Sequence, residues 1–291
     1  MDNKNPGKDI SSQDLKEKLN LTTGNLELKR VVKVSNTLIG NGNFVIMAGP
    51  NLVENETMIH ECAINLKKSG ANIIRGGAFK PLTFPQRSEK YRETGLEGLR
   101  WLREAASSVN LPCVSEITSI KDIEKAVDLV DMIQIGTRNM QNFELLRICA
   151  SMGKPILLKR GFGSSLRDFL AAGEYILNEG NEALVFCERG VVAPHTHRET
   201  SRFLIDLQII PAFKELSGYP IIVDPSHATF WAPWVTPLAL ASTAVGSDGI
   251  MLEVHPDPRN AAVDPLQSLN FEEFSLCAMK VKEIKKVLDS F

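Results

Sequence analysis

The sequence of 291 residues has few of the features that mark secreted or membrane proteins. Its five cysteines are odd in number, form no CxxC pair and lie mostly in apolar segments: Cys62, Cys113, Cys149, Cys187 and Cys277. Such usage is typical of reduced, packed thiols in a cytoplasmic protein. The N-terminus is polar and charged, unlike a signal peptide, and no apolar run approaches the ~20 residues of a membrane helix. We therefore expect a cytoplasmic protein with no membrane partner.

A strong charge imbalance is also missing, since 33 basic and 35 acidic residues leave a net charge of -2. Proteins that bind nucleic acid or an acidic membrane through their overall field usually carry excess positive charge. Neither partner is expected here, although local binding of a small anion stays open. With 43% hydrophobic residues the chain can bury a sizeable core. Its length fits one large domain or two small ones, and single α/β barrels often have this size.

Apolar segments of strand length alternate with helical segments from Phe44 onward. We expect strands near 44–48, 72–75, 112–116, 132–135, 155–158, 183–187, 220–223 and 248–252. We expect helices over Glu56–Ser69, Leu96–Ser107, Ile120–Leu129, Phe143–Met152, Ser165–Asn178, Arg198–Leu216, Thr236–Val245 and Phe271–Asp289. Eight strand–helix units predict a parallel sheet that closes as an α/β, (β/α)8 barrel. A doubly wound open sheet is the alternative, but no G-x-G-x-x-G opens the first helix.

The chain before the first barrel strand has a different pattern. Residues 1 to about 30 are polar and predict a tail followed by a short helix. Alternating apolar residues in Arg30–Leu38, followed by Gly40-Asn41-Gly42, predict a hairpin that leads into the barrel. We therefore assign residues 1–42 to an N-terminal tail and hairpin, and residues 43–291 to the barrel.

Five basic residues lie at the ends of the expected strands, nearly all beside glycine: Arg75, Lys80, Arg138, Lys159 and Arg189. The carboxyl ends of barrel strands meet at one mouth, so these side chains should converge. Clustered cations repel one another unless an anion binds among them. A ligand with a phosphate and a carboxylate would satisfy the cluster. For Arg75 and Lys80, a solvated pair is the alternative.

Acidic, amide and imidazole groups occupy other strand ends. Glu116 is either a hydrogen-bond anchor or acid/base group, or a packing residue. Asp224 and His227 follow the seventh strand, Glu253 ends the eighth, and Asp264 lies in the next loop; together they resemble a mononuclear metal site or an acid/base cluster. Structural hydrogen bonding is the alternative reading. Asn51, after the first strand, either faces the site or serves a turn.

Seven blocks, in order, resemble 3-deoxy-D-arabino-heptulosonate 7-phosphate (DAHP) synthases, with the branch related to 3-deoxy-octulosonate 8-phosphate synthases as the most similar. They are Ala48–Pro50, Arg75–Pro81, Ile135–Asn142, Leu158–Gly163, Cys187–Gly190, Val223–Thr229 and Glu253–Pro258. The resemblance spans residues 30–291. It implies a (β/α)8 barrel that condenses phosphoenolpyruvate with an aldose phosphate. Water attacks C2 of phosphoenolpyruvate, C3 attacks the aldehyde, and phosphate leaves with C–O cleavage.

The resemblance also implies residue roles. It places the five strand-end cations in the phosphoenolpyruvate pocket, with Lys80 also set to protonate or polarise the acceptor carbonyl. His227, Glu253 and Asp264 match three of the four metal positions of the family. We add Glu116, Asp224 and His227 as catalytic candidates, and Asn51 and Thr83 as substrate contacts.

One departure concerns the metal. The fourth metal position is normally the Cys after Gly-Pro, and here it is Asn51. A neutral amide supplies neither the charge nor the softness of a thiolate, and Asn at this place resembles the metal-independent octulosonate synthases. We therefore expect no required cofactor. The alternative is a divalent ion such as Mn, Zn or Fe.

A second departure concerns the acceptor. Where the family has Lys-Pro-Arg-Thr-Ser-Pro, this chain has Lys80-Pro81-Leu82-Thr83-Phe84-Pro85, so an acceptor-binding Arg is lost. Phe230-Trp231-Ala232-Pro233-Trp234 replaces a Gly and basic residues, and Val191–Arg198 is also atypical. We therefore predict an altered acceptor that is less charged, larger or more apolar than erythrose 4-phosphate, in a specialised pathway.

Two alternatives remain. If Arg87, Lys90 or Arg92 replaces the missing Arg, the protein is an ordinary DAHP synthase of the shikimate pathway. In the second alternative, the protein is a noncatalytic binding protein built on a decayed barrel. The residues before the barrel are too few for a ferredoxin-like regulatory domain or a fused chorismate mutase, so feedback inhibition by aromatic amino acids is not expected. The resemblance alone implies a homo-oligomer, a dimer or tetramer.

Overall fold

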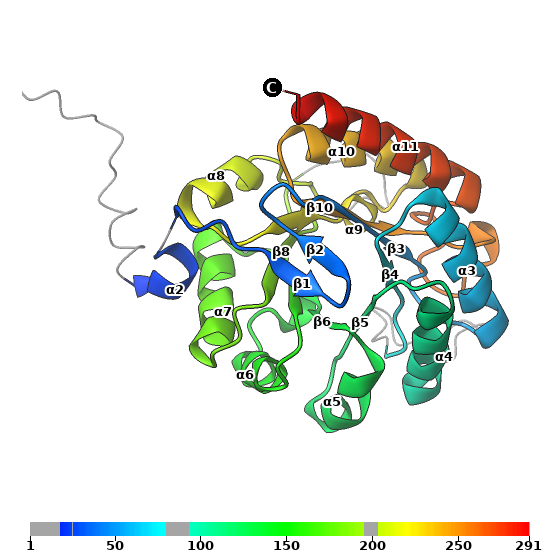
Figure 1. Ribbon diagram of the computed structural model, residues 1–291, viewed down its shortest axis with the longest axis horizontal. Helices are drawn as coiled ribbons and strands as arrows, with labels where there is room; N and C mark the ends of the chain where they lie inside the picture. The colour runs from blue at the N-terminus through cyan, green and yellow to red at the C-terminus, as the bar shows by residue number, and fades with distance from the viewer. Residues whose placement is uncertain (1–17, 25, 80–92, 195–202, 291) are drawn as a thin grey trace, which may run out of the picture.

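A computed structural model describes residues 18–24, 26–79, 93–194 and 203–290. Eight parallel strands form a closed barrel in the order β10-β3-β4-β5-β6-β7-β8-β9 (Figure 1). The strands are β3 Val45–Gly49, β4 Ile73–Arg75, β5 Cys113–Glu116, β6 Met132–Ile135, β7 Ile156–Lys159, β8 Leu184–Glu188, β9 Ile221–Val223 and β10 Gly249–Glu253. Pairing of β10 with β3 along five residues closes the barrel. The predicted barrel is confirmed, each strand lies within one residue of its expected position, and the open sheet is excluded.

Helices surround the barrel. They are α2 Asn20–Thr23, α3 Glu56–Ser69, α4 Gly95–Ser108, α5 Ile120–Ala126, η1 Val127–Leu129, η2 Thr137–Asn139, α6 Phe143–Ser151, α7 Leu166–Asn178, α8 Ile209–Leu216, α9 Pro225–Thr229, α10 Ala232–Ala244, η3 Pro258–Asn260 and α11 Phe271–Leu288. None of the described helices is long and apolar enough to cross a membrane.

Three of the predicted helices have different bounds in the structure. The one expected over Ile120–Leu129 ends as an α-helix at Ala126 and continues as the 3-10 helix η1. The expected helix over Arg198–Leu216 begins only at Ile209 within the described residues. Tertiary contacts hold the segment before it extended: Leu204 pairs with Val191 through backbone hydrogen bonds, and Asp206 accepts a 2.8 Å hydrogen bond from buried Arg160. Helix α10 starts four residues early, at Ala232, because Pro233 is tolerated in the first turn of a helix.

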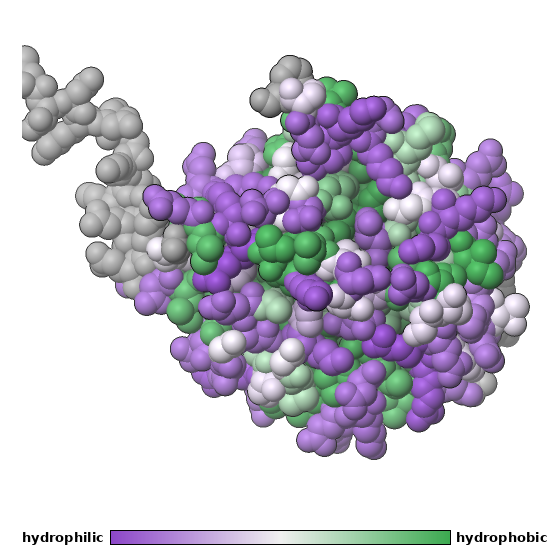
Figure 2. Space-filling model, in the orientation of Figure 1, coloured by the Kyte–Doolittle hydropathy of each residue, from purple (hydrophilic) through white to green (hydrophobic). Residues whose placement is uncertain are grey.

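The predicted hairpin is present and lies across one end of the barrel. Strands β1 (Val32–Val34) and β2 (Thr37–Ile39) pair antiparallel. Their inward residues Val32, Val34 and Ile39 join the apolar cluster inside the barrel. Hydrophobic side chains also gather over the hairpin on the outer face, within a largely hydrophilic surface (Figure 2). The hairpin therefore closes the barrel at the end opposite the carboxyl ends of the strands.

The strand alternation decides which side chains line the barrel. Apolar residues of all eight strands fill its interior: Met47, Ile73, Val114, Met132, Leu157, Cys187, Ile222 and Met251. Side chains two residues apart on a strand point to the same face. The next inward layer, at the carboxyl ends of the strands, is therefore Gly49, Arg75, Glu116, Gln134, Lys159, Arg189, Asp224 and Glu253. We call this set the mouth layer. Its three basic and three acidic residues balance in formal charge.

The cysteines are as buried as their apolar context predicts. All five are free and buried. Burial raises the pKa of all five thiols. For Cys113 and Cys149 it reaches about 12, and for Cys62, Cys187 and Cys277 it is raised as well. The thiolate is the reactive form, so these thiols are both inaccessible and unreactive in the folded protein.

We therefore expect the native protein to resist a disulfide-exchange reagent such as dithionitrobenzoate at neutral pH. Unfolding in urea should expose all five thiols, and the absorbance of the released thionitrobenzoate counts them. Rapid release from the native protein would contradict the buried, protonated state of at least one cysteine.

Candidate active site

Helix α9 shapes one wall of the mouth through its first residues. Asp224 is its N-cap and accepts a 3.0 Å hydrogen bond from the backbone N–H of His227, while Pro225 fits the first helical position. The same turn brings Nδ1 of His227 to 2.7 Å from Oδ2 of Asp224. The local sequence Asp-Pro-Ser-His therefore builds the Asp224–His227 pair. The sequence analysis placed both residues in the site but did not predict the short helix.

Lys159 enters the site from β7 and pairs with the same carboxylate. Its Nζ contacts Oδ2 of Asp224, and both side chains are almost completely buried. Burial by itself would raise the pKa of Asp224. The charges of His227 and Lys159 and their hydrogen bonds outweigh that effect and hold the pKa well below its usual range. Asp224 is therefore a carboxylate at neutral pH, shared by two donors.

Glu253, at the end of β10, contacts the remaining residues of the network. Its Oε1 lies 2.9 Å from Nε2 of His227 and 3.3 Å from a guanidinium nitrogen of Arg75. Its Oε2 accepts a 2.8 Å hydrogen bond from Nε2 of buried Gln267. Lys159, Asp224, His227, Glu253 and Arg75 thus form one continuous chain of contacts across the mouth layer.

This network changes the electrostatic argument for a bound anion. The sequence predicted that the strand-end cations repel one another and that an anion must compensate them. In the structure, Asp224 and Glu253 compensate Lys159 and Arg75 from within the protein. Charge balance alone therefore does not require an anion at these two residues, and their role in binding substrate stays a prediction.

The remaining basic residues differ in how deeply they are buried. Arg189 is 4% exposed, and its Cζ lies 4.2 Å from the ring centroid of Phe203 and 5.2 Å from that of Phe162. Arg138 lies in η2 and is exposed, so it belongs to the rim and not to the buried layer. Lys80 and Thr83 lie outside the described residues, as do Arg87, Lys90 and Arg92.

Glu116 is half-buried on the opposite side of the mouth and accepts a 3.3 Å hydrogen bond from Nε2 of Gln134. Gly136 makes room for it, because a Cβ there would lie 1.8 Å from Oε1 of Glu116. A very small cavity of about 10 Å³ lies beside Glu116, Gln134, Arg75 and Asn51. Gln134 and Gln267 were not predicted from the sequence. Gln134 lies two residues after Met132 on the same strand, so the alternation of inward and outward side chains could have indicated it, whereas no local pattern indicates Gln267.

The three residues matched to metal positions do come together. His227, Glu253 and Asp264 each offer a ligand atom, and these atoms lie within 4.8 Å of one another. They are the residues that would hold a divalent ion, which would supply Lewis acidity when bound. Each already has a partner within the protein, however: His227 faces Glu253, and Asp264 accepts a hydrogen bond from Nδ2 of Asn51. The donor set fits an ion weakly, because the fourth residue is a neutral amide.

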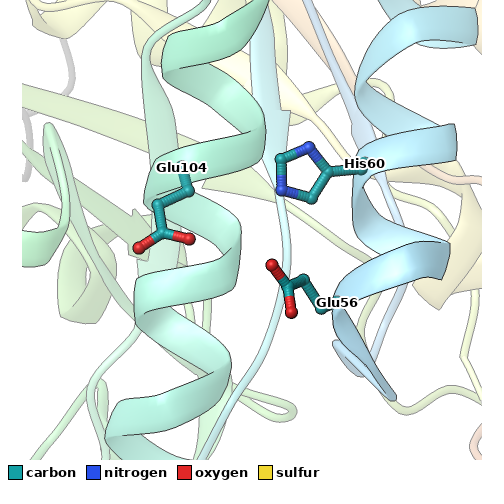
Figure 3. A group of neighbouring side chains, drawn as sticks. All are labelled: Glu56, His60 and Glu104. Carbon is teal, nitrogen blue, oxygen red and sulfur yellow. The ribbon is translucent and has the colours of Figure 1, made fainter.

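A second group of candidate ligands lies elsewhere. Glu56 and His60 of α3 point toward Glu104 of α4, with ligand atoms also within 4.8 Å of one another (Figure 3). Both glutamates are exposed on the outer layer of helices. This group does not contribute to the mouth of the barrel.

Comparisons with known proteins agree with this geometry. The DAHP synthetase I family model matches residues 20–290. A phospho-2-dehydro-3-deoxyheptonate aldolase of Thermotoga maritima is 42% identical over 260 residues, which are 89% of this chain and 74% of that protein. A 2-dehydro-3-deoxyphosphooctonate aldolase of Geobacter sp. (strain M21) is 28% identical over 283 residues, 90% of this chain and 100% of that protein.

Solved structures agree as well. The crystal structure of the Thermotoga maritima DAHP synthase superposes with a TM-score of 0.84 at 40% identity, covering 90% of this chain and 74% of that one. A truncated form of the enzyme gives 0.82 at 39% identity, covering 94% and 97%. These matches set aside the noncatalytic reading. The chain belongs to the DAHP synthetase I family and is a (β/α)8-barrel transferase that forms C–C bonds.

Proposed function

We propose that this enzyme condenses phosphoenolpyruvate with an aldehyde acceptor that differs from erythrose 4-phosphate, and releases inorganic phosphate. Water adds to C2 of phosphoenolpyruvate, C3 forms the new bond to the aldehyde carbon, and the C2–O bond breaks as phosphate leaves. The observation that carries the proposal is the buried mouth layer, which places Arg75, Lys159 and Arg189 around acid/base groups.

The residues have distinct roles in this proposal. Arg75 and Arg189 present planar guanidinium groups, which suit the phosphate and carboxylate of phosphoenolpyruvate, and Lys159 adds a point charge. Fixed cations in a site sheltered from water stabilise the charge that develops as phosphate departs. Both ring nitrogens of His227 lie against carboxylates, those of Asp224 and Glu253, so its proposed part in proton transfer runs through one of these carboxylates. Glu116 is the second acid/base candidate, and Lys80 the donor to the acceptor carbonyl.

The surroundings of α9 support a changed acceptor. A groove of about 590 Å³ runs beside the helix and is mostly apolar, with walls that include Phe203, Ala228, Thr229, Trp234 and Leu238. Two of its lining residues neighbour residues of the site: Ala228 follows His227 in α9, and Phe203 packs on Arg189. An apolar wall at this place favours an acceptor with an uncharged or apolar substituent over a second phosphate.

The second candidate is an ordinary DAHP synthase that uses erythrose 4-phosphate. It is favoured by the 42% identity to the Thermotoga maritima enzyme. The two candidates share the phosphoenolpyruvate half of the reaction and differ only in the acceptor, so an acceptor panel separates them.

We expect phosphate release from phosphoenolpyruvate to be fastest with uncharged or apolar aldehydes. Loss of one bidentate phosphate contact removes roughly 1.5–3 kcal/mol, so kcat/KM for erythrose 4-phosphate should be at least about tenfold lower than for the best acceptor. The measurement is release of inorganic phosphate across the panel, followed by mass spectrometry of the product.

A Lys159→Met variant serves as the control, because it should release no phosphate with any acceptor. If erythrose 4-phosphate proves to be the best substrate, the ordinary DAHP synthase stands and the altered acceptor is wrong.

We further propose that the reaction needs no metal ion. Asn51 is 3% exposed, and its amide donates to the carboxylate of Asp264. The amide thereby supplies a positive dipole at the place where a thiolate would complete the ligand set. The half-buried carboxylate of Asp264 thus has a hydrogen-bond donor without a cation.

Accordingly, prolonged treatment with EDTA should leave wild-type turnover within about twofold, because no ligand set of full charge is present. The Asn51→Cys variant should bind Zn²⁺ or Mn²⁺ at least about tenfold more tightly by calorimetry, and its turnover should become sensitive to the chelator. Loss of wild-type activity in EDTA, with recovery on adding a divalent ion, would show that the metal-independent assignment is incorrect.

A further inference from the structure

Phe230 adopts a backbone conformation that a bulky residue rarely takes. It ends α9 as the C-cap residue with φ 53° and ψ 24°, in the left-handed region. The other non-glycine residues with positive φ, among those the structure describes, are Ser35, Asn41, Asn110 and Asp264, all small and polar. Short polar side chains enter this region at little cost, whereas a bulky one is strained. A glycine would relieve the strain, so the phenyl ring itself should have a use.

The ring of Phe230 packs against the ring of Phe203. Its centroid lies 5.7 Å from that of Phe203, at an interplanar angle of 38°. Phe203 in turn stacks on Phe162 with centroids 5.0 Å apart and an interplanar angle of 11°. The guanidinium of Arg189 lies over both rings, nearer to Phe203. Phe230 therefore contacts Arg189 indirectly, through the Phe203–Phe162 pair.

Local secondary structure gives Phe203 little support. It lies just before an isolated bridge between Leu204 and Val191, in a segment that is neither helix nor strand. The orientation of its ring consequently depends on side-chain packing. Gly190 allows the close approach, because a Cβ there would lie 2.9 Å from Cβ of Phe203 and 3.1 Å from Cβ of Ala228. Phe162 and Phe230 then hold the ring from two other elements, the loop after β7 and the end of α9.

The energy of this arrangement depends on the ring position. A guanidinium within about 6 Å of an aromatic centroid is attracted to its face, and the attraction is larger where water is excluded. Arg189 is 4% exposed and Phe203 8% exposed, so their contact is sheltered. A shift of the Phe203 ring would weaken this contact and change the position of the guanidinium.

We propose that Phe230 is a positioning residue that holds Phe203 against Arg189, so that the guanidinium is fixed in the orientation that binds phosphoenolpyruvate. To place its ring against Phe203, Phe230 adopts the strained left-handed backbone conformation. The inference rests on the proposed role of Arg189 in binding phosphoenolpyruvate and adds to it the group that holds the arginine in place.

Two substitutions at one position separate positioning from stability. Phe230→Ala and Phe230→Gly both remove the ring, but only glycine relieves the left-handed strain. We expect both variants to bind phosphoenolpyruvate about three- to tenfold more weakly than wild type by calorimetry. The glycine variant should nevertheless melt at a higher temperature than the alanine variant. Phe230→Tyr, which keeps the ring, should bind as wild type does.

The matched control is Asn110→Gly. Asn110 also has φ 53°, but it lies in the loop between α4 and β5, at the opposite end of the barrel. This variant makes the same kind of change at a left-handed position far from the mouth, and it should leave the affinity for phosphoenolpyruvate unchanged. Arg189→Gln should weaken binding at least as much as Phe230→Ala does.

The outcomes distinguish the two levels of the proposal. If wild type and Arg189→Gln bind phosphoenolpyruvate equally, or wild type does not bind it, the proposed binding role of Arg189 fails and the inference fails with it. If Arg189→Gln weakens binding but both ring-removal variants bind as wild type, only the positioning role of Phe230 is overturned. Affinity losses that follow the melting temperatures of the Ala and Gly variants would also overturn it, because they would show a structural role alone.

Discussion

The charged side chains buried in the mouth layer form ion pairs with one another, and the geometry of the rest of the site depends on these pairs. Arg75, Lys159, Asp224 and Glu253 are each 4% exposed or less. Removing one partner of such a pair leaves an uncompensated charge and typically costs roughly 3–5 kcal/mol. The groups proposed to bind substrate are therefore the groups that hold one another in place. His227 links the two ion pairs, so the orientation of its ring is determined by both carboxylates.

The two halves of the site differ in how they are held. The half proposed to bind phosphoenolpyruvate is built on strand ends, where the closed sheet fixes Arg75, Lys159 and Glu253. The half near α9 is built from aromatic and apolar side chains on less regular segments, with Phe203 and Phe230 as examples. A reaction shared by the family can thus be retained on the rigid half while the acceptor changes on the other. Asn51 follows β3 and donates a hydrogen bond to Asp264, at the position where the proposal of a metal-free reaction places this contact.

Sequence reasoning was most accurate where local pattern and tertiary structure agree. Short apolar segments that are bounded by turns and alternate with helical segments are typical of buried parallel strands, and every strand was located within one residue. The expected helix over Arg198–Leu216 was too long, because Arg160 and the Val191–Leu204 bridge hold part of it extended. Helix α9 was missed because five residues carry no periodic signal; only its cap, Asp224, could have indicated it.

The sequence by itself determined the eight-stranded barrel, the family, and which strand ends carry Arg75, Lys159, Asp224, His227 and Glu253, since these follow from alternation and from motifs contiguous in the chain. Only the tertiary structure decided how those groups pair. Whether Glu253 meets Arg75, Gln267 or His227 depends on contacts between strands and loops far apart in sequence. The same holds for the strained backbone of Phe230, because the ring that justifies it belongs to Phe203, on another element.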